Sequence, residues 1–170
     1  MDKKRELQKI ATQIKKSKCP LSKSSTNPVP GEGPANAKIM FIGAAPGRME
    51  DLTGKPFVGR SGKFLTKLMN KIGLRREKVF ITSVEKHFPP KNRPPKKKEI
   101  ETCKPYLIRQ LEIISPEIVV LLGKTAETVK NEHILKNKKI LITAHPSAGM
   151  RFPKIAQKMR KDFQKLKQML

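Results

Sequence analysis

Three short segments of the sequence combine residue types that could bind a ligand and act on it, and each segment follows an apolar run. Gly43–Asp51 follows the run KIMFI, Ser83–Lys98 follows VFIT, and Ala144–Arg151 follows KILIT. Parallel strands present their carboxyl ends at one edge of a sheet, and ligands bind outside that edge. If the runs are strands of one parallel sheet, we expect the three segments to meet in a single site.

The first segment reads Gly43-Ala-Ala-Pro-Gly-Arg-Met-Glu-Asp51. Its glycines permit a tight turn and a close approach of the backbone to a ligand. The carboxylates of Glu50 and Asp51 could hold and polarise a water molecule for attack. An ordinary turn between a strand and a helix, with two solvated acids, would have the same sequence, so both interpretations stay open here.

The continuation Lys55-Pro-Phe-Val-Gly-Arg-Ser-Gly62 offers two further groups. Phe57 stands in a loop flanked by glycines and presents a flat surface on which a planar ligand could stack, although a core residue would look the same. Ser61 stands at the expected start of a helix, where free N–H groups and the helix dipole favour a phosphate.

The last segment, Thr143–Arg151, places His145 directly after an apolar run. A neutral imidazole at a strand end can donate a hydrogen bond to negative charge that develops in a transition state. A purely structural histidine is the alternative. Small residues then lead to Met150 and Arg151, a pattern that suits a loop inserting an apolar wedge into a DNA groove.

The composition indicates a polyanionic partner. The 170 residues include 38 Lys and Arg against 14 Asp and Glu, a formal net charge of +24. Nucleic acid is the first expectation and an anionic membrane surface the second. The stretch Lys86–Lys98 is rich in lysine, arginine and proline and has no acid, which suits tracking of phosphates along a strand. We expect Lys91, Arg93 and Lys96 to contact DNA.

The rest of the composition narrows the class of protein. No apolar run approaches the roughly 18 residues needed to cross a bilayer, and the N-terminus has no signal-peptide core. The two cysteines do not make a disulfide framework. Extracellular and membrane-spanning proteins are therefore not expected, and the expected location is the cytoplasm. We also expect a monomer whose partner is DNA rather than a membrane.

Apolar periodicity indicates the elements that must position these segments. Helices are expected near 3–16, 61–72, 100–114 and 125–131 and from Pro153 onward, and strands at 38–42, 79–84, 118–122 and 139–143. Pro105 should kink the third helix or mark a later start. Continuously apolar strands that alternate with helices predict an α/β fold: three α/β/α layers around a central, mainly parallel four-stranded sheet. We expect residues 1–170 to form one domain, with a helix and an extended loop at 1–37 packed on it.

Together these segments resemble the uracil-DNA glycosylase superfamily, and most closely its family-four branch, which commonly carries an iron–sulfur cluster. The resemblance extends from about Cys19 to Arg151. It rests on ordered motifs, namely Val29–Gly33, Phe41–Gly47 with Glu50-Asp51, Gly54–Gly59, Pro89–Pro94, Glu99–Leu107, Leu122-Gly123 and His145-Pro146.

The resemblance implies a hydrolase that flips a deaminated base, uracil first of all, out of DNA and hydrolyses its N-glycosidic bond. The product would be an abasic site for base excision repair. Phe57 would stack on the flipped base, His145 would hydrogen-bond its carbonyl oxygen, and Glu50 with Asp51 would orient the attacking water. The remaining positions implied are Gly43, Ala44, Ala45 and Ser83 around the base, and Ser61, Met150 and Arg151 on the DNA.

Two positions of the site depart from the family pattern. Ala44 stands where the family has a glutamate, and Ser83 stands where it has the asparagine that reads the base. A serine hydroxyl is shorter than an asparagine amide and makes fewer hydrogen bonds. Three alternatives therefore stay open: a glycosylase for hypoxanthine or xanthine, a non-catalytic DNA-binding module, and a nucleotide-binding α/β protein that shares only the glycine turn.

The family's four cluster ligands fall at Lys16, Cys19, His87 and Cys103 of this sequence. Four cysteines are the norm for such clusters, with histidine an occasional substitute. We expect that no cofactor is bound, with a retained [4Fe–4S] cluster as the less favoured alternative. Without a cofactor, Cys19, His87 and Cys103 would be remnant ligands or ordinary packed side chains.

Overall fold

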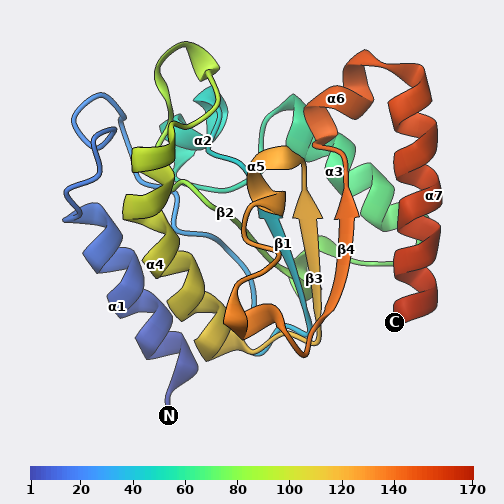
Figure 1. The fold of residues 1–170 in the computed structure, drawn as a ribbon, viewed down its shortest axis with the longest axis horizontal. Coiled ribbons are helices and arrows are strands. Elements are labelled where there is room, and N and C mark those ends of the chain that lie inside the picture. Colours follow the sequence, from blue (N-terminus) through green and yellow to red (C-terminus); the bar gives the residue numbers. More distant parts are fainter.

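The computed structural model describes residues 1–170 and is built on a four-stranded parallel sheet (Figure 1). The strands lie in the order β2-β1-β3-β4, and every neighbouring pair is parallel. Their bounds are Ile39–Gly43 for β1, Phe80–Ser83 for β2, Ile118–Leu122 for β3 and Lys139–Thr143 for β4. The predicted central four-stranded sheet is confirmed, and all of its strands are parallel.

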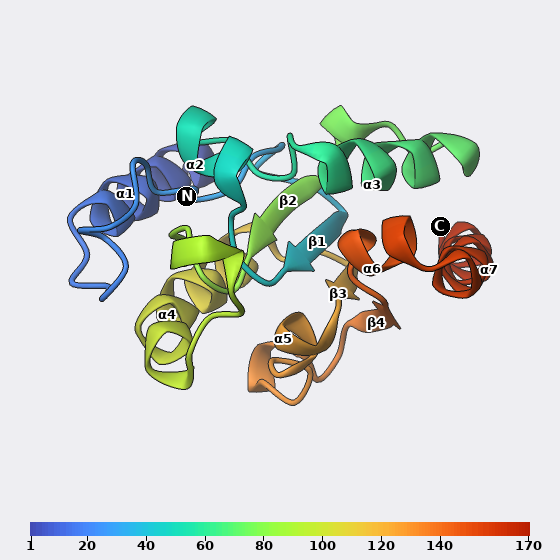
Figure 2. The ribbon, with the colours of Figure 1, turned by 90° about the horizontal axis from the view of Figure 1, so that it is seen from above.

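Helices cover both faces of the sheet, as the view from above shows (Figure 2). The helices α3 (Arg60–Lys71) and α7 (Pro153–Met169) pack on one face, and α4 (Lys97–Ile114) with the short α5 (Lys124–Glu127) pack on the other. The helix α1 (Lys3–Lys15) packs against α4. This arrangement is the predicted three-layer α/β/α fold.

The core lies in two halves, one on each side of the sheet, because successive strand residues point to opposite faces. Phe41 points toward α3 and α7, and its ring packs against that of Phe163 with 6.1 Å between the centroids. Its neighbours Met40 and Ile42 point toward α4 and α5. Both faces are therefore covered, which explains why the two central strands, β1 and β3, are buried at every position rather than at every second one.

The structure differs from the sequence expectations chiefly at short elements. Two helices, α2 (Arg48–Thr53) and α6 (Pro146–Arg151), occupy segments that the sequence analysis treated as loops. Helix α4 begins at Lys97 and continues through Pro105, so Pro105 does not mark a late start. Short 3₁₀ turns lie at Arg76–Lys78, Pro90–Asn92 and His133–Leu135.

The two short helices form because their first turns are capped. The side chain of Glu50 accepts a hydrogen bond from the backbone N–H of Gly47, the residue that precedes α2. His145 caps α6 by accepting from the backbone N–H of Ser147, and Pro146 supplies the preset backbone angle favoured at a first helical position. None of the helices is both long and apolar enough to cross a membrane.

Candidate active site

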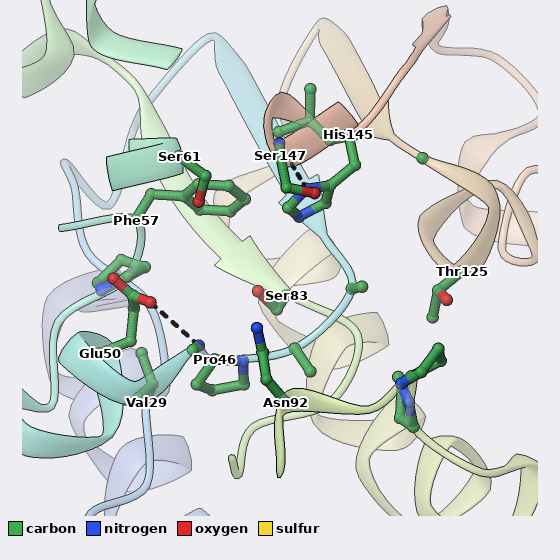
Figure 3. A pocket seen from close by; sticks show the side chains of 18 of the residues that line it. Val29, Pro46, Glu50, Phe57, Ser61, Ser83, Asn92, Thr125, His145 and Ser147 are labelled. Carbon is green, nitrogen blue, oxygen red and sulfur yellow. Dashed lines mark hydrogen bonds between the residues drawn. The ribbon is translucent and has the colours of Figure 1, made fainter. Parts of the chain in front are cut away.

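A cavity of about 290 Å³ opens at the carboxyl edge of the sheet (Figure 3). Its walls come from the ends of all four strands: Ala44–Gly47 after β1, Ser83 at the end of β2, Leu122–Thr125 at and after β3, and His145 after β4. The three segments expected to meet do so. The exit of β3 joins them; the sequence analysis named Leu122-Gly123 as a family motif but did not place it in the site.

His145 has a fixed tautomer. Its Nδ1 accepts a hydrogen bond from the backbone N–H of Ser147 at 3.1 Å, and the Ser147 hydroxyl lies 2.8 Å from the same atom. A backbone N–H can only donate, so Nδ1 carries no proton and the proton sits on Nε2. Burial lowers the pKa of His145, although the charge of Glu50 acts in the opposite direction. The ring is therefore a neutral donor through Nε2–H.

Phe57 faces His145 in the cavity, with 5.7 Å between the ring centroids and 32° between the planes (Figure 3). Its backbone has φ = 47°, a strained conformation for a residue with a bulky side chain. Two glycines make room for it. A side chain at Gly43 would lie about 2.5 Å from the Phe57 ring, and one at Gly62 would overlap the Phe57 carbonyl.

Arg76 holds the Phe57 loop in place and was missed by the sequence analysis. Its guanidinium donates to the carbonyl oxygens of both Phe57 and Pro56. Burial lowers the pKa of Arg76, while Glu32 and Glu50 act to raise it. In the sequence Arg76 is one of several basic residues before β2, and nothing about its position indicates its distant partners.

Glu50 and Asp51 are separated by the structure. Glu50 lines the cavity, and its carboxylate accepts from the backbone N–H groups of Gly47, Val58 and Gly59 at 3.0, 2.9 and 2.7 Å. Asp51 does not line the cavity. Its Oδ1 accepts from two backbone N–H groups of the loop between α1 and β1, those of Thr26 and Asn27, and the side chain is buried.

Ser83, Ala44 and Ala45 line the cavity, and Gly43 lies beneath the Phe57 ring. The backbone of Ser83 is tied to a buried lysine, because Lys86 Nζ donates to the Ser83 carbonyl at 2.7 Å. Burial lowers the pKa of Lys86 to about 7. The Ser83 hydroxyl itself has no hydrogen-bond partner within the protein and is directed to the cavity (Figure 3).

The residues expected to contact DNA fall into two groups. Ser61 and Arg93 line the cavity. The guanidinium of Arg93 is already bound to both carboxylate oxygens of Glu99, at 2.8 and 3.0 Å. The other four are exposed and do not line the cavity, namely Lys91, Lys96, Met150 and Arg151. Asn92, Thr125 and Ser147 line it without having been predicted.

Cys19, Glu85, His87 and Cys103 form a second group of side chains, here called the cysteine cluster. Their ligand atoms all lie within 4.8 Å of one another, and all four residues are buried. The contact with Cys103 lowers the pKa of Cys19 to about 6, and the same contact raises the pKa of Cys103. The expectation that no cofactor is bound is not supported, because these donors could hold a metal ion.

The donors do not fit a [4Fe–4S] cluster, however. Such a cluster takes one ligand for each of its four irons, with four thiolates the norm, and this chain has two cysteines. Lys16, at the position of the missing ligand, is exposed at the end of α1 and outside the group. Glu85 Oε1 instead lies 3.0–3.3 Å from both sulfurs and from His87 Nδ1. Sequence reasoning missed Glu85, although it is the only acid between β2 and Glu99.

Comparison with known proteins agrees with this architecture. The model of the uracil DNA glycosylase superfamily matches residues 30–170. A type-4 uracil-DNA glycosylase of Saccharolobus solfataricus is 45% identical over 95% of this chain and 85% of its own length. Those of Archaeoglobus fulgidus and Thermotoga maritima are 43% and 41% identical, over 88% and 84% of this chain and 85% and 82% of their own lengths.

The chain therefore belongs to the uracil DNA glycosylase superfamily. Within the superfamily its similarity is to the type-4 branch, as the resemblance had indicated. A type-5 uracil-DNA glycosylase of Pyrobaculum aerophilum, by contrast, is 37% identical over only 58% of this chain and 50% of its own length.

Proposed function

We propose that this protein is a uracil-DNA glycosylase that hydrolyses the N-glycosidic bond of a deaminated base and leaves an abasic site. Membership of the type-4 branch supports this proposal, and so does the cavity. Its volume of about 290 Å³ is at the small end of ligand pockets, which suits a single nucleobase rather than a nucleotide cofactor. The base must leave the duplex to enter, at a cost of a few kcal/mol in lost pairing and stacking.

The observation that carries the proposal is the fixed tautomer of His145 opposite Phe57. A base stacked on Phe57 would present a carbonyl oxygen to Nε2–H of His145. Uracil leaves as an anion, so a donor fixed in advance at that oxygen stabilises the transition state by about 3–4 kcal/mol. A neutral imidazole suits this role because its donor is in place before negative charge develops.

Glu50 would hold the water that attacks the sugar carbon. A carboxylate has about four acceptor sites, and backbone N–H groups occupy three of those on Glu50. The fourth can accept a hydrogen bond from water and place it for attack. Asp51, which holds the backbone of Thr26 and Asn27, acts as a positioning residue for the loop beside α2.

Ser83 would read the edge of the base with one hydroxyl. A single hydroxyl discriminates less strongly between bases than an amide that donates and accepts together. For this reason the substrate test below includes hypoxanthine and xanthine as well as uracil.

The charge of +24 would hold DNA largely through its phosphates. Ser61 at the start of α3 and the exposed Lys91 and Lys96 are proposed contacts of the backbone. Met150 is 39% exposed and would fill the gap that the flipped base leaves, with Arg151 on the neighbouring phosphate. We further propose that residues 1–170 act as one domain and as a monomer inside the cell, with DNA as the partner.

The proposal is tested with duplex and single-stranded oligonucleotides that carry one uracil, hypoxanthine or xanthine, followed by alkaline cleavage at abasic sites. We expect strand breaks at uracil. Strand breaks only at hypoxanthine or xanthine would support glycosylase activity but assign it a different substrate. Tight binding to all of these oligonucleotides without any strand break would contradict glycosylase activity and favour a DNA-binding module.

A further inference from the structure

The cysteine cluster lies outside the pocket, and the proposed excision of a base makes no use of it. Its members come from three separate parts of the chain: Cys19 from the loop after α1, Glu85 and His87 from the segment after β2, and Cys103 from α4. All four are at most 2% exposed. Two thiols, an imidazole and a carboxylate from distant segments have thus been brought together in the interior.

The separations within the cluster are within a few tenths of an ångström of the edges of a small tetrahedron. Glu85 Oε1 lies 3.3 Å from Cys19 Sγ, 3.0 Å from Cys103 Sγ and 3.3 Å from His87 Nδ1, and Cys103 Sγ lies 4.0 Å from His87 Nδ1. Zinc binds sulfur at about 2.3 Å and nitrogen or oxygen at about 2.0–2.2 Å, so the donors of a tetrahedral zinc site are about 3.4–3.8 Å apart. Small shifts of the side chains would admit one ion.

One atom of the cluster lacks a partner. Glu85 Oε2 is buried and makes no hydrogen bond. The carboxylate is fully buried, and a buried charge is costly unless it is paired or coordinates a metal. A cation among the four donors would pair with the buried charge of this carboxylate.

The surroundings of Glu85 also resemble those of a metal ligand. The backbone N–H groups of Lys86 and His87 each donate to Glu85 Oε1 at 3.0 Å. Ligating carboxylates are commonly fixed by such outer hydrogen bonds, which orient them toward the ion. Here the segment after β2 supplies two ligands and also the groups that hold one of them.

We propose that Cys19, Glu85, His87 and Cys103 bind a single structural zinc ion at the place where relatives of the iron–sulfur type would carry their cluster. The mixed sulfur, nitrogen and oxygen donor set in a compact group of four favours zinc over calcium or magnesium, which take only oxygen. Four protein ligands leave no open position for water or substrate, so the ion is structural rather than catalytic.

The ion would fasten the loop between α1 and β1 to the body of the protein. Cys19 lies near the start of that loop, and Val29, further along, donates its backbone N–H to the Lys86 carbonyl at 2.8 Å and lines the cavity. A clamp at Cys19, Glu85, His87 and Cys103 therefore fixes a segment that forms part of the pocket wall. The zinc proposal does not depend on which base the pocket accepts.

The first test measures the metal content of the full-length protein, purified without chelators, for zinc, iron and acid-labile sulfide. We expect one zinc ion per chain and neither iron nor sulfide. Iron together with sulfide would overturn the proposal in favour of a cluster. Protein that holds no metal, and still binds none when zinc chloride is added, would also overturn it.

The second test replaces the ion with Co²⁺ added as cobalt chloride. We expect the intense visible absorption of tetrahedral Co²⁺ together with sulfur-to-cobalt charge transfer. The weak absorption of six-coordinate Co²⁺, or the absence of charge transfer, would contradict a site with two thiolates in a tetrahedron. This test uses the unmodified chain, so it does not depend on the folding of any variant.

A matched pair of variants assigns the site. Glu85→Gln keeps the shape of the side chain and should weaken zinc binding by more than about 100-fold, since loss of even an outer partner costs about 10–100-fold. The control is Glu127→Gln, at a surface glutamate paired with Lys130, which should keep full affinity. Removal of zinc by a chelator should lower the Tm of the unmodified protein by roughly 5–10 °C. Equal affinity of the two variants would show that Glu85 is not a ligand.

Discussion

Ser83 and Glu85 are two residues apart at the end of β2, yet they belong to regions of opposite character. Ser83 lines a cavity of about 290 Å³, where its hydroxyl and the Nε2–H of His145 have no partner within the protein. Glu85 lies in the cysteine cluster, where four side chains turn toward one another and exclude solvent. The pocket keeps room for a ligand the size of a base, whereas the donor atoms of the cluster all lie within 4.8 Å of one another.

The difference shows how the surroundings of a polar side chain decide its role. A polar group with open space in front of it can act on a substrate, and one enclosed by other donors can hold the chain together. If chemistry is confined to the pocket and stability to the cluster, substitutions in the two regions should have separable effects on rate and on Tm.

Replacing His145 by Ala should have the largest effect. Loss of a preorganised donor of this kind lowers the rate by about 10²–10³-fold. The measurement is single-turnover excision from a uracil-containing duplex, with the melting temperature recorded alongside. The control is His133→Ala, at an exposed histidine that belongs to neither the cavity nor the cysteine cluster. A His145→Ala variant with the wild-type rate would remove His145 from the mechanism.

Glu50→Ala should lower the rate by about 10²-fold, because it removes the proposed acceptor for water. It should also lower the Tm, since three backbone N–H groups lose their partner. Glu50→Ala is thus expected to lower both the rate and the Tm. A lower Tm with an unchanged single-turnover rate would make Glu50 a positioning residue only.

The pH dependence of the single-turnover rate should follow His145. Burial lowers the pKa of His145 below its usual value of 6.5, so the neutral donor is the form present at pH 7. The rate should be constant from pH 8 to 6.5 and fall about tenfold for each further unit of pH once the lowered pKa is passed. A rate that rises as the pH falls through 6.5 would indicate that the imidazolium is the active form.

Ser83→Asn should raise kcat/KM for uracil by about two- to tenfold, the worth of one added hydrogen bond of about 0.5–1.5 kcal/mol. The comparison is made with hypoxanthine and xanthine substrates, for which no gain is expected. An equal change for all three bases would show that position 83 does not read the base.

Lys91→Ala and Lys96→Ala should have the smallest effects. Each removes one proposed phosphate contact and should reduce the slope of log K against log salt by about 1, equally for damaged and undamaged DNA. Binding titrations between low and moderate salt measure the slope. The comparison variant is Lys38→Ala, which removes a charge beside β1 paired with Glu117. Equal slopes for Lys38→Ala and Lys96→Ala would show that DNA binding depends on the overall charge of the protein and not on a particular face.

The pocket could be predicted from the sequence because strand ends in a parallel sheet converge wherever the apolar runs are clear. Gly43 and His145 follow directly from that rule together with residue type, whereas Phe57 was suggested by its glycine-flanked loop and the role of Ser83 by the family resemblance. The sequence did not reveal Arg76, whose partners are backbone carbonyls on a distant loop. Nor did it separate Glu50 from Asp51, since neighbouring residues of a helix can face different surroundings.

The cysteine cluster, by contrast, could be predicted only in part from the sequence. Cys19, His87 and Cys103 were found by analogy with a four-ligand pattern, and the analogy supplied Lys16 as the fourth residue. The structure supplies Glu85 instead, two residues before His87. A ligand set drawn from three separate segments depends on how they pack, and spacing along the chain does not contain that information.

Hydrolysis in the pocket should release a free base. The most direct test is mass analysis of both products after single turnover on an oligonucleotide with one uracil. We expect free uracil and an intact strand with one abasic site from the unmodified protein, and unreacted strand over the same time from His145→Ala. A strand that is broken without alkali, or that binds and yields no free uracil, would contradict this expectation.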